Sequence, residues 1–161
     1  MTTLRVNGRA HDLEIAADAT LANVLRNSLH LYGVRVSCSE GECGSCTVLV
    51  DGEPVTACLM LAMQAEGVEI TTIEGLAGRD ALHPIQRAFV EEQAFQCGFC
   101  TPGFVLTAKA FLEEHADPTE EEIAAAMNGS ICRCGSYPFI VRAVHAAART
   151  MREDSVVKAG S

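Results

Sequence analysis

Hydrophobic and polar positions alternate over the first residues of the chain, with the period of two that is typical of β-strands. Leu4 and Val6 alternate with polar residues, Asn7-Gly8 is a two-residue turn signal, and Leu13 and Ile15 resume the alternation. We therefore predict a β-hairpin at the start of the chain.

A helix and further strands are predicted after this hairpin. Thr20 is a suitable N-cap for a helix whose apolar face ends near Gly33. Asp51-Gly52 is a second hairpin signal, because it lies between two apolar stretches. The further strands that we expect are Thr47–Val50, Val55–Ala57 and Val68–Thr72. Together these elements predict a mixed sheet packed on a helix, which is an α+β arrangement.

The second half of the chain has the period of a helix. A linker is expected over residues 73–82, and beyond it no strand pattern returns. Four helices are predicted, beginning at His83-Pro84, Thr101-Pro102, Thr119 and Pro138. We expect Thr101 to be an N-cap with Pro102 in the first turn, and Thr119 to form a capping box with Glu122. Four helices predict a compact bundle.

The change of period divides the 161 residues into two domains. We place the first domain at residues 1–74 and the second at residues 82–150. Residues 151–161 are mostly polar or small, and we expect them to form a loose tail. Domains of this size bury little apolar surface and commonly need a covalent cross-link or a bound metal for stability. The eight cysteines of the chain can provide one.

Charge and hydropathy exclude several classes of protein. The net charge is −9, and none of the 12 Lys and Arg residues form a run, so we expect no nucleic-acid partner. Met1–Val6 does not have the form of an export signal, and the apolar run Ala57–Met63 is too short to span a membrane. We expect a cytoplasmic protein with reduced thiols, although a folded complex exported on a partner's signal would look the same.

Four cysteines in the first half have the spacing of a plant-type [2Fe-2S] loop. Four residues separate the first two, two residues separate the next two, and the last follows after eleven more. These cysteines are Cys38, Cys43, Cys46 and Cys58. Gly41 and Gly44 allow the tight turns that bring backbone N–H groups toward the sulfurs. A zinc site or a disulfide pair is the alternative, but zinc ligands usually come as two closely spaced pairs.

The second half contains two tight cysteine pairs, Cys97 with Cys100 and Cys132 with Cys134. Each pair lies just before a helix with proline in its first turn, so two helix N-termini are expected to point toward one centre. The positive ends of these helices would favour the more negative, reduced form of a cluster and raise its potential. A thioredoxin-like motif, a four-cysteine zinc site and structural free cysteines remain alternatives from the residues alone.

Both sets of cysteines, taken together, resemble one known family. The motifs that carry the resemblance are Cys38–Cys46 with Cys58, Gln96–Gly103, and Ile131–Gly135. In order and spacing they are similar to the small iron-sulfur subunit of molybdenum hydroxylases, the xanthine oxidase and aldehyde oxidoreductase family. The resemblance covers residues 3–150 and implies an N-terminal β-grasp ferredoxin domain followed by a four-helix bundle, each holding one [2Fe-2S] cluster.

The resemblance also implies partners. A large subunit would hold a molybdopterin cofactor with its molybdenum, and the helical-domain cluster would receive electrons from it, with Gln96 and Cys134 close to the pterin. The ferredoxin-domain cluster would pass the electrons to FAD on a medium subunit or to a haem protein. The chain itself would carry no catalytic residue.

One motif departs from many relatives, which have Thr-Gly-Tyr after the last cysteine where this chain has Gly135-Ser136-Tyr137. Similar Gly-small-Tyr versions resemble subunits of aldehyde and N-heteroaromatic hydroxylases rather than of carbon monoxide dehydrogenase. We therefore expect an electron-transfer subunit of a hydroxylase for such substrates. The alternative function is a free-standing ferredoxin whose helical domain binds zinc and serves as an interaction module.

Overall fold

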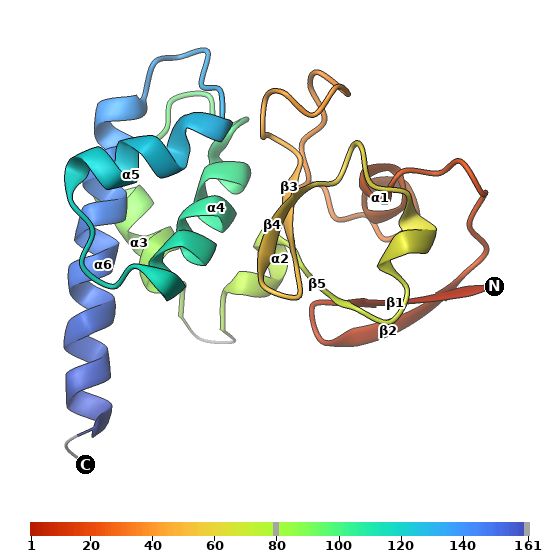
Figure 1. The fold of residues 1–161 in the computed structure, drawn as a ribbon, viewed down its shortest axis with the longest axis horizontal. Coiled ribbons are helices and arrows are strands. Elements are labelled where there is room, and N and C mark those ends of the chain that lie inside the picture. Colours follow the sequence, from red (N-terminus) through yellow and green to blue (C-terminus); the bar gives the residue numbers. More distant parts are fainter. Residues whose placement is uncertain (79–80, 160–161) are drawn as a thin grey trace.

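The computed structural model describes residues 1–78 and 81–159, which form a sheet-containing half and a helical half placed side by side (Figure 1). Residues 79–80 of the predicted linker and residues 160–161 of the predicted tail lie outside the described residues. Each half has its own core of buried apolar side chains. The α+β class predicted from the sequence is confirmed, with the sheet in the first half and the bundle in the second.

The first half contains a five-stranded sheet in the order β2-β1-β5-β3-β4. Its strands are β1 (Thr2–Val6), β2 (Arg9–Leu13), β3 (Thr47–Val50), β4 (Glu53–Thr56) and β5 (Glu69–Thr71). The pair β1–β5 is parallel and the other neighbours are antiparallel. Both predicted hairpins are present, and Asn7 and Asp51 adopt the positive φ angles that tight turns require.

One helical segment covers the sheet, and it is shorter and less regular than predicted. It consists of α1 (Leu21–Asn23) and a π-helical turn (Val24–Ser28). Thr20 is the N-cap as predicted, because its Oγ1 accepts a hydrogen bond of 3.2 Å from the Asn23 N–H. The buried face packs on the alternating inward side chains of the sheet, including Leu4, Val6 and Ile70.

The second half is built from four helices, as predicted. They are α3 (Pro84–Glu91), α4 (Thr101–Glu114), α5 (Glu120–Ala126) and α6 (Tyr137–Ala159). The Thr119–Glu122 capping box is confirmed, since the Glu122 carboxylate accepts from the Thr119 N–H at 2.7 Å and Thr119 Oγ1 accepts from the Glu122 N–H. No helix in the described part of the chain is both long and apolar enough to cross a membrane.

Three predictions about these helices are corrected. Thr101 is the first residue of α4 rather than its N-cap, because Cys100 already lies near helical geometry at φ −81° and ψ −13°. The linker contains a short helix, α2 (Ile73–Leu76), whose Glu74 carboxylate accepts from the Gly33 N–H at 2.7 Å. Residues 151–159 are helical rather than loose.

The extension of α6 through Ala159 is supported by contacts with residues far away in the sequence. Met151 packs against the core of the bundle, and the Arg152 guanidinium donates to the Ala116 carbonyl and pairs with the Asp117 carboxylate. These contacts hold the last helix against the segment between α4 and α5. A sequence pattern of polar and small residues does not reveal them.

Candidate metal centres

The first candidate centre is the loop from Cys38 to Cys46, whose backbone curves around a central space. Ser39, Gly41 and Gly44 all have positive φ, at 59°, 79° and 67°. This left-handed backbone turns N–H groups inward, and the Glu40 N–H lies 3.4 Å from Cys38 Sγ. The predicted glycine turns are therefore present, and the loop has the backbone geometry of an anion cradle.

The four cysteines of this centre lie together as two pairs. The Cys38 thiol is a neighbour of the Cys43 thiol, and the Cys46 thiol is a neighbour of the Cys58 thiol, which follows β4. The Glu40 N–H is the main cause that lowers the pKa of Cys38 to about 7, whereas burial raises the pKa of Cys46 to about 12. A metal that binds here must displace a proton from Cys46, while Cys38 readily offers a thiolate near neutral pH.

The second candidate centre lies where two interhelical loops meet. Cys97 and Cys100 follow α3, and Cys132 and Cys134 precede α6. The Sγ atoms of Cys97 and Cys134 are 3.5 Å apart, and the Cys100 and Cys132 thiols are neighbours. A disulfide would need the sulfurs at about 2.05 Å, so these are two pairs of free thiols.

The pKa shifts of the second set depend on hydrogen bonds as well as on burial. The Phe99 N–H lowers the pKa of the exposed Cys97 thiol, and burial raises that of Cys100 to about 12. Burial also acts to raise the pKa of Cys132. Hydrogen bonding outweighs burial there, chiefly from the Ser136 N–H, and the pKa is lowered. Each centre thus has at least one sulfur with a lowered pKa and one whose pKa is raised by burial.

The arrangement of each set as two thiol pairs fits a diiron cluster better than a single ion. A [2Fe-2S] cluster needs two thiolates on each of two irons, whereas tetrahedral zinc needs four ligands around one point. Among the described residues, no three His, Cys, Asp or Glu side chains converge closely enough to hold one metal ion.

The two centres are joined through the backbone of their loops. The Ile131 N–H donates to the Cys43 carbonyl at 3.0 Å, and Ile131 directly precedes Cys132. Gly103, in the first turn of α4, lies so close to Gly44 that a Cβ there would overlap the Gly44 carbonyl oxygen. The loop of the first centre therefore packs directly on the helix start of the second. Sequence patterns do not predict this contact, because it depends on how two distant loops are placed.

Gln96 lies on the surface next to the second centre. Its Nε2 donates to the Cys134 carbonyl at 3.0 Å, which fixes the amide beside the last cysteine loop. An open hollow of about 420 Å³ adjoins it and is lined in part by Phe95, Ser136 and Phe139. The structure thus brings the two residues predicted to face a pterin, Gln96 and Cys134, to one place. Ser136, on the same hollow, was noted in the sequence only as a departure from relatives.

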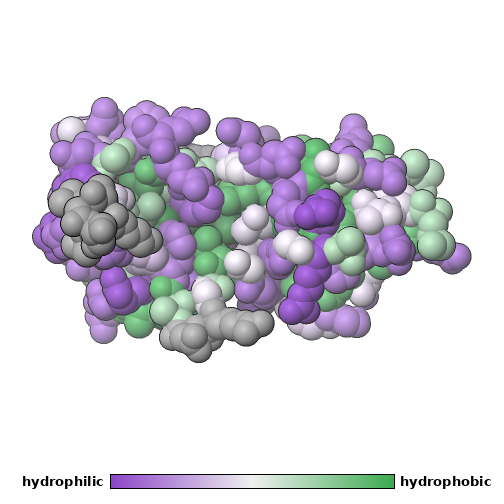
Figure 2. Space-filling model, turned by 90° about the horizontal axis from the view of Figure 1, so that it is seen from below, coloured by the Kyte–Doolittle hydropathy of each residue, from purple (hydrophilic) through white to green (hydrophobic). Residues whose placement is uncertain are grey.

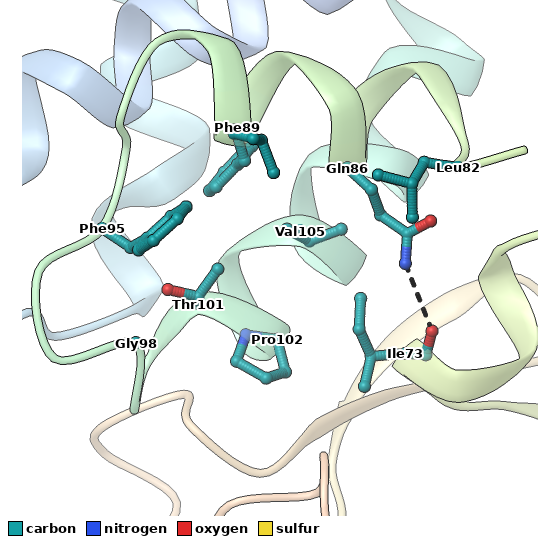
Figure 3. Close-up of a pocket in the computed structure, with 10 residues that line it drawn as sticks. Ile73, Leu82, Gln86, Phe89, Phe95, Gly98, Thr101, Pro102 and Val105 are labelled. Atoms are coloured by element: carbon teal, nitrogen blue, oxygen red, sulfur yellow. Dashed lines mark hydrogen bonds between the residues drawn. The ribbon is translucent and has the colours of Figure 1, made fainter.

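A second hollow of about 320 Å³ lies between the linker, α3 and the start of α4 (Figure 3). Leu82, Phe89, Phe95 and Val105 point into it, and the Gln86 side chain donates to the Ile73 carbonyl across one edge at 3.4 Å. None of its ten lining residues is titratable. This hollow therefore offers no titratable group for acid-base chemistry.

Most of the surface seen from below is hydrophilic, and apolar side chains show between the polar ones in both halves (Figure 2). Exposed large apolar residues are found beside both candidate centres. Phe95, Phe99, Ile131, Tyr137 and Phe139 lie near the second centre in the sequence, and Leu59, Leu61 and Met63 follow the last cysteine of the first.

Comparison with known protein families assigns one domain to each centre. Residues 4–73 match the family described as 2Fe-2S iron-sulfur cluster binding domain, and residues 72–145 match the [2Fe-2S] binding domain family. Two [2Fe-2S] clusters per chain are therefore supported, and the resemblance predicted from the cysteine motifs is confirmed.

Individual relatives agree with these matches. The chain is 45% identical to the aldehyde oxidoreductase iron-sulfur-binding subunit of Escherichia coli K12, over 91% of this chain and 70% of that one. It is 47% identical to the nicotinate dehydrogenase small FeS subunit of Eubacterium barkeri, over 91% of this chain and 90% of that one. Among solved structures, quinoline 2-oxidoreductase from Pseudomonas putida 86 matches with a TM-score of 0.90 and 39% identity, over 94% of this chain and 95% of that one.

Proposed function

Because this chain belongs to the family of small iron-sulfur subunits of molybdenum hydroxylases, we propose that it relays electrons one at a time between two partner-held cofactors. The observation that carries the proposal is the contact between the two cysteine loops. Cys43 of the first set and Ile131, the neighbour of Cys132, share a backbone hydrogen bond of 3.0 Å. This bond gives the electron a short, well-packed route between the two domains.

Each thiol quartet, in this proposal, holds one [2Fe-2S] cluster. Cys38, Cys43, Cys46 and Cys58 ligate the cluster of the ferredoxin domain, and Cys97, Cys100, Cys132 and Cys134 ligate that of the helical domain. A bound cluster supplies reversible one-electron chemistry. The protein contributes the thiolates, the inward N–H groups of the first loop and the N-termini of α4 and α6, which favour added negative charge.

The helical domain is the side that meets the larger partner. We place the molybdopterin of this larger partner next to Gln96 and Cys134, since both border an open hollow beside the second centre. The ferredoxin domain then faces the final acceptor, which is FAD on a medium subunit or a haem protein. Among the relatives are proteins named for aldehyde, nicotinate and quinoline oxidation, which supports an aldehyde or an N-heteroaromatic compound as the substrate of the complex. Eight reduced cysteines support a cytoplasmic location.

A free-standing ferredoxin with a zinc-bound helical module is not favoured. The helical half matches a [2Fe-2S] binding domain family, and the relatives include proteins named as subunits of dehydrogenases. The pairing of its thiols also differs from four ligands around one ion.

Metal analysis tests the proposed cluster content. We expect anaerobically purified protein to contain about four iron and four sulfide per chain, with two distinguishable EPR signals after reduction. The zinc content of the same preparation is measured alongside its iron content. Stoichiometric zinc with about two iron per chain would support the free-standing ferredoxin instead.

The Gln96→Ala variant tests the assigned partner side. In the complete complex we expect it to be reduced by substrate more slowly, by up to about tenfold, because one oriented amide hydrogen bond is lost beside Cys134. Reduction by dithionite, which bypasses the partner cofactor, should keep its wild-type rate. Gln93→Ala, an exposed glutamine on the same hollow, is the control. Equal slowing in both variants would argue against a specific role for Gln96.

A further inference from the structure

Ser136 directs two groups toward one cysteine sulfur of the helical domain. Its backbone N–H donates to Cys132 Sγ at 3.5 Å, and its hydroxyl lies beside the same sulfur. The residue is only 1% exposed, and the hydroxyl has no hydrogen-bond partner among the described residues. A buried hydroxyl without a partner costs free energy unless something accepts its proton. The nearby sulfur of a metal-bound thiolate is such an acceptor.

Ser136 lies between the Cys132 sulfur and a hollow at the surface of the protein. It lines the hollow that Gln96 also borders, so it lies between the second centre and the place where the partner cofactor is proposed to sit. Ser136 does not have a positive φ angle, so alanine can adopt the same backbone conformation. The hydroxyl is therefore not needed to form the turn, which is completed by Gly135 at φ 76°.

We propose that the Ser136 hydroxyl is a hydrogen-bond donor that raises the reduction potential of the helical-domain cluster. This inference rests on the proposed function, because it requires a cluster on Cys97, Cys100, Cys132 and Cys134. Ser136 is a positioning residue, since it acts through the Cys132 sulfur and touches no substrate. It sets how readily electrons enter the chain from the partner.

The direction of the effect follows from charge. When the cluster takes up one electron from the partner, one ferric ion becomes ferrous, no bond breaks and no proton is required. The thiolate sulfurs become more negative, so a donor aimed at Cys132 Sγ stabilises the reduced form more than the oxidised one. Loss of the hydroxyl therefore lowers the potential.

The Ser136→Ala and Ser136→Gly variants test this proposal in the full chain by EPR-monitored redox titration. A hydrogen bond to a charged acceptor supports a change of about tenfold in the equilibrium between reduced and oxidised cluster. For one electron that is a fall of about 59 mV. The ferredoxin-domain cluster, titrated in the same sample, should keep its potential.

Thr101→Val is the matched control. The Thr101 hydroxyl is also buried and unpartnered at the start of a helix, next to Cys100, but its side chain lies at the apolar hollow. Figure 3 shows it among Gly98, Phe95 and Pro102. We expect no shift of either potential in this variant.

Three results would overturn the proposal. The potential of the helical-domain cluster could stay unchanged in both Ser136 variants, or Thr101→Val could lower it equally, which would indicate a general effect of buried hydroxyls. Both Ser136 variants could also lose this cluster, which would make the hydroxyl a requirement for holding the cluster rather than for its potential. Failure of the proposed function itself would look different, because wild-type protein would then lack iron in the helical domain.

Discussion

The Cys132→Ser variant is expected to lose the helical-domain cluster and to keep the ferredoxin-domain cluster. Cys132 is buried, and the other seven cysteines of the chain are already assigned to the two quartets, so no spare thiol remains to replace it. A serine hydroxyl does not ionise near neutral pH as a thiol does, and it is a poor ligand for iron. Iron should fall from about four to about two per chain. Substrate-driven turnover of the complete complex should fall by more than about hundredfold.

The remaining EPR signal identifies which cluster was lost. Cys58→Ser is the matched variant in the other domain, because Cys58 is likewise buried and paired with one neighbour, Cys46. It should remove the signal that Cys132→Ser leaves in place. If either single variant abolished both signals, the two domains would not hold their clusters independently, and the assignment of ligands to two separate quartets would be wrong.

The Gly103→Ala variant is expected to loosen the packing between the two domains without changing any cysteine. Its new Cβ would overlap the carbonyl oxygen of Gly44, which belongs to the backbone of the first cluster loop and cannot rotate away. Overpacking of this kind costs about 1–3 kcal/mol. We expect both clusters to be retained, electron transfer between them to slow, and the magnetic interaction between the two reduced clusters to weaken in EPR spectra.

Gly129→Ala is the control for this steric effect. Gly129 lies at the same junction, where its carbonyl approaches Gly44, but a Cβ on Gly129 itself would meet nothing within 4 Å. Transfer between the clusters should stay at the wild-type rate. If Gly103→Ala behaved like Gly129→Ala, tight packing of α4 on the first loop would not be needed for electron relay. The route through the Ile131–Cys43 hydrogen bond would then lose its main support.

Short-range signals in the sequence predicted much of the fold. The Asn7-Gly8 and Asp51-Gly52 hairpins, the Thr20 cap and the Thr119–Glu122 capping box are all present. Each depends on residues within a few positions of one another, so the local sequence contains the whole interaction. The predicted division at residues 74 and 82 stays a prediction, although the two matched families meet at residues 72–73.

Predictions failed where a distant contact decided the local structure. The backbone after Met151 continues as a helix because Arg152 reaches Ala116 and Asp117, 36 and 35 residues away. The short helix α2 interrupts the expected linker where Glu74 accepts from the Gly33 N–H. Composition indicates only the average tendency of such segments.

The sequence by itself determined the eight cysteines, their spacing and the family they indicate, because these are properties of order along the chain. The tertiary structure decided which thiols form pairs, that Ile131 donates to Cys43, and that the Ser136 hydroxyl is buried beside Cys132. The physical reason is that these contacts join segments whose approach depends on how the two domains pack. The candidate ligands are therefore predicted from spacing, while the contact between the two loops and the surroundings of each sulfur depend on the packed fold.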